Sequence, residues 1–123
     1  MKSKIFFSNK TVDTNYTDVA TVNNNDCEVL GVQIKNNGSV PLSGFKFQAR
    51  LASTGDYVDI KTANFLDSDM NLLYASDAVD TLAAGSSVIM YFNMTMFDDF
   101  RIQAKVSSST TTLSGVLLLI KEV

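Results

Sequence analysis

The chain has 123 residues and a mass of 13.4 kDa, the size of one domain. Its formal net charge is −3, and its ten basic residues are scattered along the sequence. Binding to a phosphate backbone requires a concentrated basic surface, so we expect no nucleic acid partner.

Histidine is absent, and the single cysteine is Cys27. The chain therefore lacks the commonest general base and the commonest zinc ligand, and it cannot form an intramolecular disulfide. We expect no enzymatic activity, no metal and no cofactor. No apolar run approaches the ~18 residues of a membrane-spanning helix, so we also expect no membrane partner. The apolar run after Lys4 is too short for a signal peptide, which predicts a protein that is made and used in a reducing cytoplasm, or one that leaves it without the general secretory route.

The first 26 residues are polar, with an isolated apolar triplet, Ile5, Phe6 and Phe7. We expect residues 1–12 to form an extended N-terminal arm, anchored by this triplet, that adds a strand to the free edge of a neighbouring protein. Apolar residues between positions 12 and 22 predict a first strand. The polar run 23–26 predicts a turn, since Asn and Asp tolerate left-handed backbone.

Alternation with a period of two predicts strands over 28–35 and 43–53. Pro41 cannot donate to a ladder, so residues 36–42 are expected to form the loop between them. A tight turn at 54–56 leads into a short strand at 57–60. Residues 62–85 show no regular pattern and are predicted to be irregular. Within them, residues 67–71 match the opening of a calcium loop, but Leu72 and Ala78 occupy positions where such a loop has Gly and Glu.

Strands are predicted over 86–96, 100–107 and 112–122. Ile89 and Tyr91, on the outward side of the first of these, are apolar, and the run 116–120 is apolar on both sides. A strand face open to water does not have this composition. Two alternatives remain open: other segments of the chain cover this face, or another protein covers it.

Several strands of this kind in one short chain predict two sheets packed face to face. We expect all of residues 1–123 to form a single all-β domain, an antiparallel β-sandwich of about seven strands. The run Val32 to Phe45, the turn at Leu82 to Ser87 and the strand opening at Phe100 resemble the immunoglobulin-like sandwiches of the CARDB type. The chain as a whole resembles small immunoglobulin-like accessory proteins of tailed bacteriophages, which decorate the virion.

The resemblance implies a non-catalytic virion protein, assembled in the host cytoplasm as a capsid decoration or stabilising subunit. It implies the major capsid protein or another virion protein as partner, and several copies of the chain on the particle. The expected contact residues are Ile5, Phe6, Phe7, Ile89, Tyr91, Leu117 and Leu119. Two alternatives are a carbohydrate- or cell-surface-binding module, although Trp is absent, and a tail or neck subunit.

Overall fold

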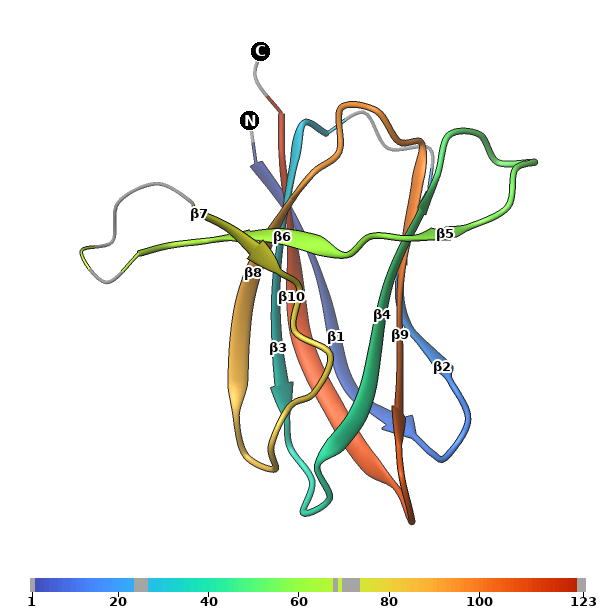
Figure 1. Ribbon diagram of the computed structural model, residues 1–123, viewed down its shortest axis with the longest axis vertical. Coiled ribbons are helices and arrows are strands. Elements are labelled where there is room, and N and C mark those ends of the chain that lie inside the picture. Colours follow the sequence, from blue (N-terminus) through green and yellow to red (C-terminus); the bar gives the residue numbers. More distant parts are fainter. Residues whose placement is uncertain (1, 24–26, 68, 70–73, 122–123) are drawn as a thin grey trace.

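The computed structural model describes residues 2–23, 27–67, 69 and 74–121, and these form ten strands and no helix (Figure 1). The strands are β1 (Lys2–Val12), β2 (Thr17–Val22), β3 (Val29–Asn36), β4 (Leu42–Arg50), β5 (Val58–Asp59), β6 (Thr62–Phe65), β7 (Tyr74–Asp77), β8 (Ser87–Asn93), β9 (Asp99–Val106) and β10 (Thr111–Ile120). In this part of the chain no helix is long and apolar enough to cross a membrane.

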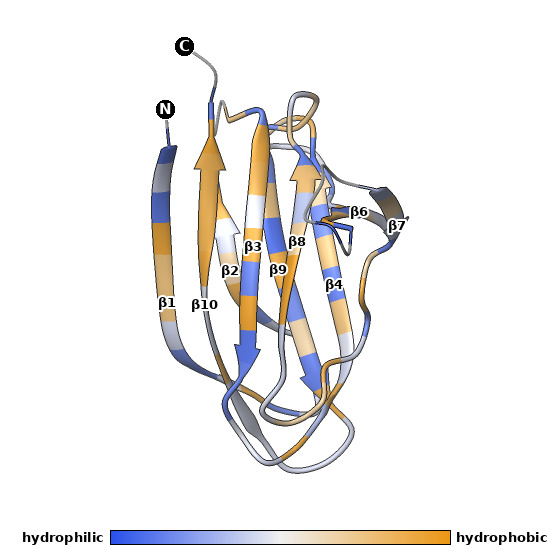
Figure 2. Ribbon diagram, turned by 90° about the vertical axis from the view of Figure 1, so that its left-hand side faces the viewer, coloured by the Kyte–Doolittle hydropathy of each residue, from blue (hydrophilic) through white to orange (hydrophobic). Residues whose placement is uncertain are grey.

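The strands form two antiparallel sheets that pack as a sandwich, which confirms the predicted fold class. A six-stranded sheet has the order β1-β10-β3-β8-β6-β7, and a four-stranded sheet has the order β2-β9-β4-β5. Figure 2 shows β1, β10, β3 and β8 side by side, with the strands of the other sheet behind them.

The core is built from the inward-facing residues of both sheets. Phe47 of β4 and Phe100 of β9 lie on the four-stranded sheet, and Phe92 of β8 lies between them on the other sheet. The ring centroid of Phe92 is 5.1 Å from that of Phe47 and 5.2 Å from that of Phe100. All three rings are buried, so they join the two sheets through desolvated aromatic contacts.

The strands with clean alternation lie where the sequence predicts them, with shifts of a few residues at their ends. β4 ends at Arg50, so Leu51, which lies within the strand predicted over 43–53, is exposed in the turn that follows. The turn at 54–56 connects β4 to β5, which pair antiparallel.

The count of about seven strands is too low, because two regions are strands that the sequence does not predict. Residues 2–12 form β1, which pairs with β10, and they are therefore not a free arm. Part of the segment predicted to be irregular forms the hairpin of β6 and β7. Both regions form through pairing with a neighbouring strand and carry little alternation of their own.

Candidate interaction surface

The outer face of the six-stranded sheet carries two rows of side chains that run across the strands. In one row Phe6 lies opposite Val116, and Gln33 lies between Val116 and Ile89. In the other row Lys4, Leu118, Gly31 and Tyr91 follow one another from β1 to β8. We name the apolar members of these rows the apolar face: Phe6, Ile89, Tyr91, Val116 and Leu118.

The exposure of the apolar face is high for side chains of this size. Phe6 is 71% exposed and Ile89 is 46% exposed, while the other three members are half-buried. In Figure 2 no described strand crosses in front of β1, β10 and β3, and β1 lies beside β10 at the edge of the sheet. The first alternative that the sequence leaves open, coverage by other segments of the chain, is therefore wrong for the N-terminal segment, which is a strand of the sheet itself.

Gly31 determines how Tyr91 lies on the apolar face. An ideal Cβ at position 31 would be 3.2 Å from Cε1 of Tyr91 and 3.4 Å from Cβ of Leu118. The tyrosine ring therefore occupies the space that a side chain at position 31 would fill, next to Leu118. Glycine at this position allows an aromatic side chain to lie flat on a neighbouring strand.

Two shallow hollows lie on this side of the sheet and meet at Gln33, Ile89 and Tyr91. The hollow toward β1 has a volume of about 380 Å³ and is lined by Phe6 and Leu118, among others. The hollow toward β7 has a volume of about 410 Å³. Its aromatic walls are Phe65 and Tyr74, whose ring centroids are 5.8 Å apart, together with Tyr91.

Three of the residues predicted for contact, Phe6, Ile89 and Tyr91, lie together on the apolar face. Ile5 is also exposed, although its side chain is on the side of β1 that faces the core, because β1 is the edge strand of the sheet. Whether any of these four residues contacts a partner remains a prediction.

The contact prediction is wrong for Phe7 and Leu117, which are buried in the core, with 8% and 0% of their surface exposed. Leu119 also packs against the core and is half-buried. In β10 the outward residues are Val116 and Leu118, because Leu117 lies opposite the core residue Val32. The sequence contained both outward residues within its apolar run, but a run that is apolar on both sides does not reveal which side is outward.

The outer face of the four-stranded sheet is polar, and its cations have partners. The ring of Tyr16 lies beside the ammonium groups of Lys46 and Lys105, at 4.2 and 5.0 Å, respectively. The guanidinium groups of Arg50 and Arg101 lie 4.4 and 4.0 Å from the ring of Tyr57. Folding thus gathers onto one face four cations that are scattered in the sequence, and each of them contacts an aromatic ring.

Hydrogen bonds connect the same polar face. Arg50 donates to a carboxylate oxygen of Asp99 at 2.7 Å, and Arg101 donates to Gln48 at 2.7 Å. The amide of Gln48 in turn donates to Asp59 at 2.8 Å. This polar network contrasts with the apolar face on the other side of the molecule, which makes the apolar face the stronger candidate for a protein interface.

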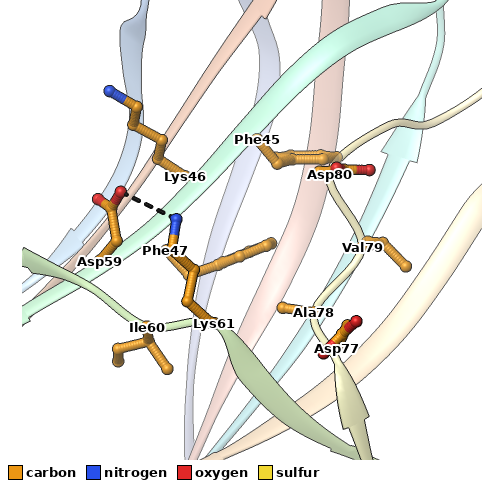
Figure 3. A pocket seen from close by; sticks show the side chains of 10 residues that line it. All are labelled: Phe45, Lys46, Phe47, Asp59, Ile60, Lys61, Asp77, Ala78, Val79 and Asp80. Atoms are coloured by element: carbon orange, nitrogen blue, oxygen red, sulfur yellow. Dashed lines mark hydrogen bonds and ion pairs between the residues drawn. The ribbon is translucent and has the colours of Figure 1, made fainter.

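A groove of about 300 Å³ runs along the side of the sandwich where β4 and β5 approach the segment that contains β7 (Figure 3). Lys61 donates to Asp59 at 3.3 Å, and Asp77 and Asp80 lie on the opposite wall. The hydrogen bond from Gln48, with a smaller contribution from Lys61, lowers the pKa of Asp59 below its ordinary value. Such a carboxylate stays ionised at neutral pH, so it is a poor general acid or base there.

Among the described residues no group of three or more His, Cys, Asp or Glu side chains is placed to hold a metal ion. The calcium-loop match at residues 67–71 lies largely outside the described residues, since residues 68 and 70–73 are not among them. Cys27 is buried at the core.

No family model matches the sequence, and no curated protein matches it. Solved structures of similar fold include the following three, all at low sequence identity. The SPBc2 prophage-derived protein YomS matches with a TM-score of 0.54 and 13% identity over 96% of this chain and 95% of YomS. The PBSX exported protein XepA matches with a TM-score of 0.60 and 14% identity over 96% of this chain, which spans 38% of XepA.

The third structure, PirA, matches with a TM-score of 0.51 and 14% identity over 94% of this chain and 91% of PirA. At these identities the likeness shows a shared fold. The resemblance to CARDB-type sandwiches remains a prediction, because no family model matches.

Proposed function

We propose that this chain is a non-catalytic structural subunit of a phage particle that attaches to the major capsid protein or another virion protein through its apolar face. The observation that carries the proposal is the apolar face itself. Five apolar side chains lie side by side on a strand-paired and therefore rigid surface, and Phe6 is largely exposed. Desolvation of such a surface is the main source of binding free energy between proteins.

The names of two proteins of similar fold support the proposal that this chain belongs to a phage particle. One is described as an SPBc2 prophage-derived protein and the other as a PBSX exported protein. Within the particle we favour the role of a capsid decoration subunit. Many identical sites on a shell convert weak single contacts into durable attachment, because each further contact is intramolecular once the first has formed.

The experiment is co-sedimentation of the purified chain with particles of the phage that encodes it, assembled without this chain. We expect binding by the unaltered protein, and a loss of affinity of about tenfold or more in each of the variants Phe6→Ser and Ile89→Ser. The matched control is Leu51→Ser, because Leu51 is 68% exposed but lies in the turn after β4, away from the apolar face.

Unchanged binding of the Phe6→Ser and Ile89→Ser variants would contradict the proposed attachment surface. Electron microscopy of the reconstituted particles separates the capsid from the tail or neck as the place of attachment. A failure to bind particles, together with hits on a glycan array, would instead support a carbohydrate-binding module.

A further inference from the structure

The charges of this chain are distributed unevenly along the sequence, which the net charge conceals. Residues 51–85 contain six aspartates and one basic residue, Lys61, so this segment has a net charge of −5 in a chain of net charge −3. The aspartates are Asp56, Asp59, Asp67, Asp69, Asp77 and Asp80. The remainder of the chain is therefore basic, with a net charge of +2.

Folding places the later part of this acidic segment at one end of the six-stranded sheet, whereas β5, which contains Asp59, belongs to the four-stranded sheet. The segment contains β6 and β7, which are the last two strands of the sheet, and β1 is the strand at the opposite end (Figure 2). β1 carries Lys2, Lys4 and Lys10 and no carboxylate. The strands β1, β10, β3 and β8 together contain no Asp or Glu at all, so the sheet runs from a basic edge to an acidic edge.

Both edges are strands with a free side, since β1 pairs with β10 alone and β7 pairs with β6 alone within the described residues. The outer backbone groups of such strands are open to pairing with another chain. Two β1 edges would bring lysines against lysines, and two β7 edges would bring carboxylates against carboxylates. Only the pairing of β1 with β7 brings opposite charges together.

Shape and direction fit the same pairing. Each strand pairs antiparallel with its neighbour along the order β1-β10-β3-β8-β6-β7, so a β1 strand added beyond β7 would continue this alternation by pairing antiparallel with β7. Phe6 projects from the β1 end, and the hollow of about 410 Å³ between Phe65, Tyr74 and Tyr91 lies at the β7 end of the same outer side.

We infer that copies of this chain associate head to tail, with β1 of one copy adding to β7 of the next and Phe6 entering the hollow beside Tyr74. This contact is heterologous, so it produces a ring or an open row of copies. β6 meets β8 at a single residue pair and crosses the direction of the other strands (Figure 1), so successive copies are rotated relative to one another. The four residues of β7 allow few hydrogen bonds, and each contact is therefore weak in solution.

The test uses sedimentation velocity on the pure chain and two charge-reversal variants. In the K2E/K4E variant both edges are acidic, and in the D77K/D80K variant both edges are basic. We expect the unaltered chain to associate as its concentration rises, and to do so less at about 500 mM than at about 50 mM salt. Each variant alone should associate about tenfold more weakly, and an equimolar mixture of the two should recover association.

The control for the change of charge compares Lys35→Glu with Lys4→Glu. Lys35 is exposed on β3, a strand with neighbours on both sides, whereas Lys4 lies on the edge strand β1. Circular dichroism establishes that each variant is folded. A monomeric unaltered chain at high concentration and low salt would overturn the inference. So would a mixture of the two variants that stays monomeric, or variants that associate as the unaltered chain does. The inference concerns copies of the pure chain, so its failure leaves the proposed attachment to a particle to be decided by co-sedimentation.

Discussion

Asn36 is a buried polar side chain that makes four hydrogen bonds. Its amide nitrogen donates to the carbonyl of Val40 at 2.9 Å and to that of Leu82 at 3.3 Å. Its amide oxygen accepts from the backbone nitrogen of Gly38 at 3.1 Å and from the hydroxyl of Thr111 at 2.6 Å. One side chain thus joins the end of β3, the following loop, the start of β10 and the segment before β8.

We expect Asn36→Ala to lower the free energy of unfolding by roughly 3 kcal/mol, because it leaves several buried donors and acceptors without partners. Urea denaturation followed by circular dichroism measures this change. The control is Asn37→Ala, since Asn37 is exposed and its side chain makes one hydrogen bond, to Ser114 at 2.6 Å; we expect a loss below about 1 kcal/mol. Equal losses in the two variants would show that the network around Asn36 contributes no stability of its own.

At the scale of elements, β1 is held to the sheet by an aromatic contact as well as by its ladder. Gly115 of β10 lies opposite Phe7 of β1. An ideal Cβ at position 115 would be 2.8 Å from Cζ of the Phe7 ring and would also overlap the backbone oxygen of Gln33. The phenylalanine ring therefore lies directly on the glycine, and a strand that carries few other buried residues is fixed by this contact.

We expect Gly115→Ala to destabilise the protein by about 1–3 kcal/mol and to loosen β1 in particular, because the added methyl group displaces the Phe7 ring and strains β3. Hydrogen exchange measured by mass spectrometry should show faster exchange in residues 2–12. The matched control is Gly55→Ala, where the added Cβ would meet only the Ala52 oxygen, at an ordinary 3.4 Å. Protection of β1 that is the same in both variants would contradict this account of how β1 is held.

The same comparison of elements explains what the sequence predicts well and what it does not. β4 and β9 have one wet and one buried face, so alternation located both strands, and the all-β sandwich followed from them. In β10 every residue from Val116 to Ile120 is apolar, so the phase of the strand was not determined and Leu117 was assigned to the wrong face. β1 was missed as part of the sheet because its partner begins about 100 residues later along the chain.

The candidate surface, too, could be predicted only in part, because local sequence patterns do not show which distant strands pair. Ile89 and Tyr91 were identified because apolar residues on an outward side are unusual. Their position next to Phe6 depends on the order β1-β10-β3-β8, which brings together segments from both ends of the chain. The gathering of Tyr16 and Tyr57 between pairs of cations is likewise a result of register that no local pattern indicates.

At the scale of the whole molecule, the two outer faces differ in the polarity of the side chains that they expose. The four-stranded sheet presents ring-stacked cations, amides and carboxylates that remain favourable in water. The six-stranded sheet presents the apolar face, with lysines beside it on β1 and β3. The protein thus has one polar and one apolar outer face, and an apolar probe in solution should bind the apolar face in preference to the polar one.

We expect the native chain to bind a fluorescent apolar dye such as anilinonaphthalene sulfonate, because the apolar face offers hollows lined by aromatic side chains. The measurement is made at low protein concentration and about 500 mM salt, where association between copies is weak. The double variant Phe6→Ser/Ile89→Ser should lose most of the dye fluorescence. Leu51→Ser/Val58→Ser removes two apolar residues elsewhere that are 68% and 67% exposed, and this variant should retain the fluorescence. If both double variants lose the signal equally, the dye reports scattered apolar side chains, and the six-stranded sheet has no special affinity for apolar surfaces.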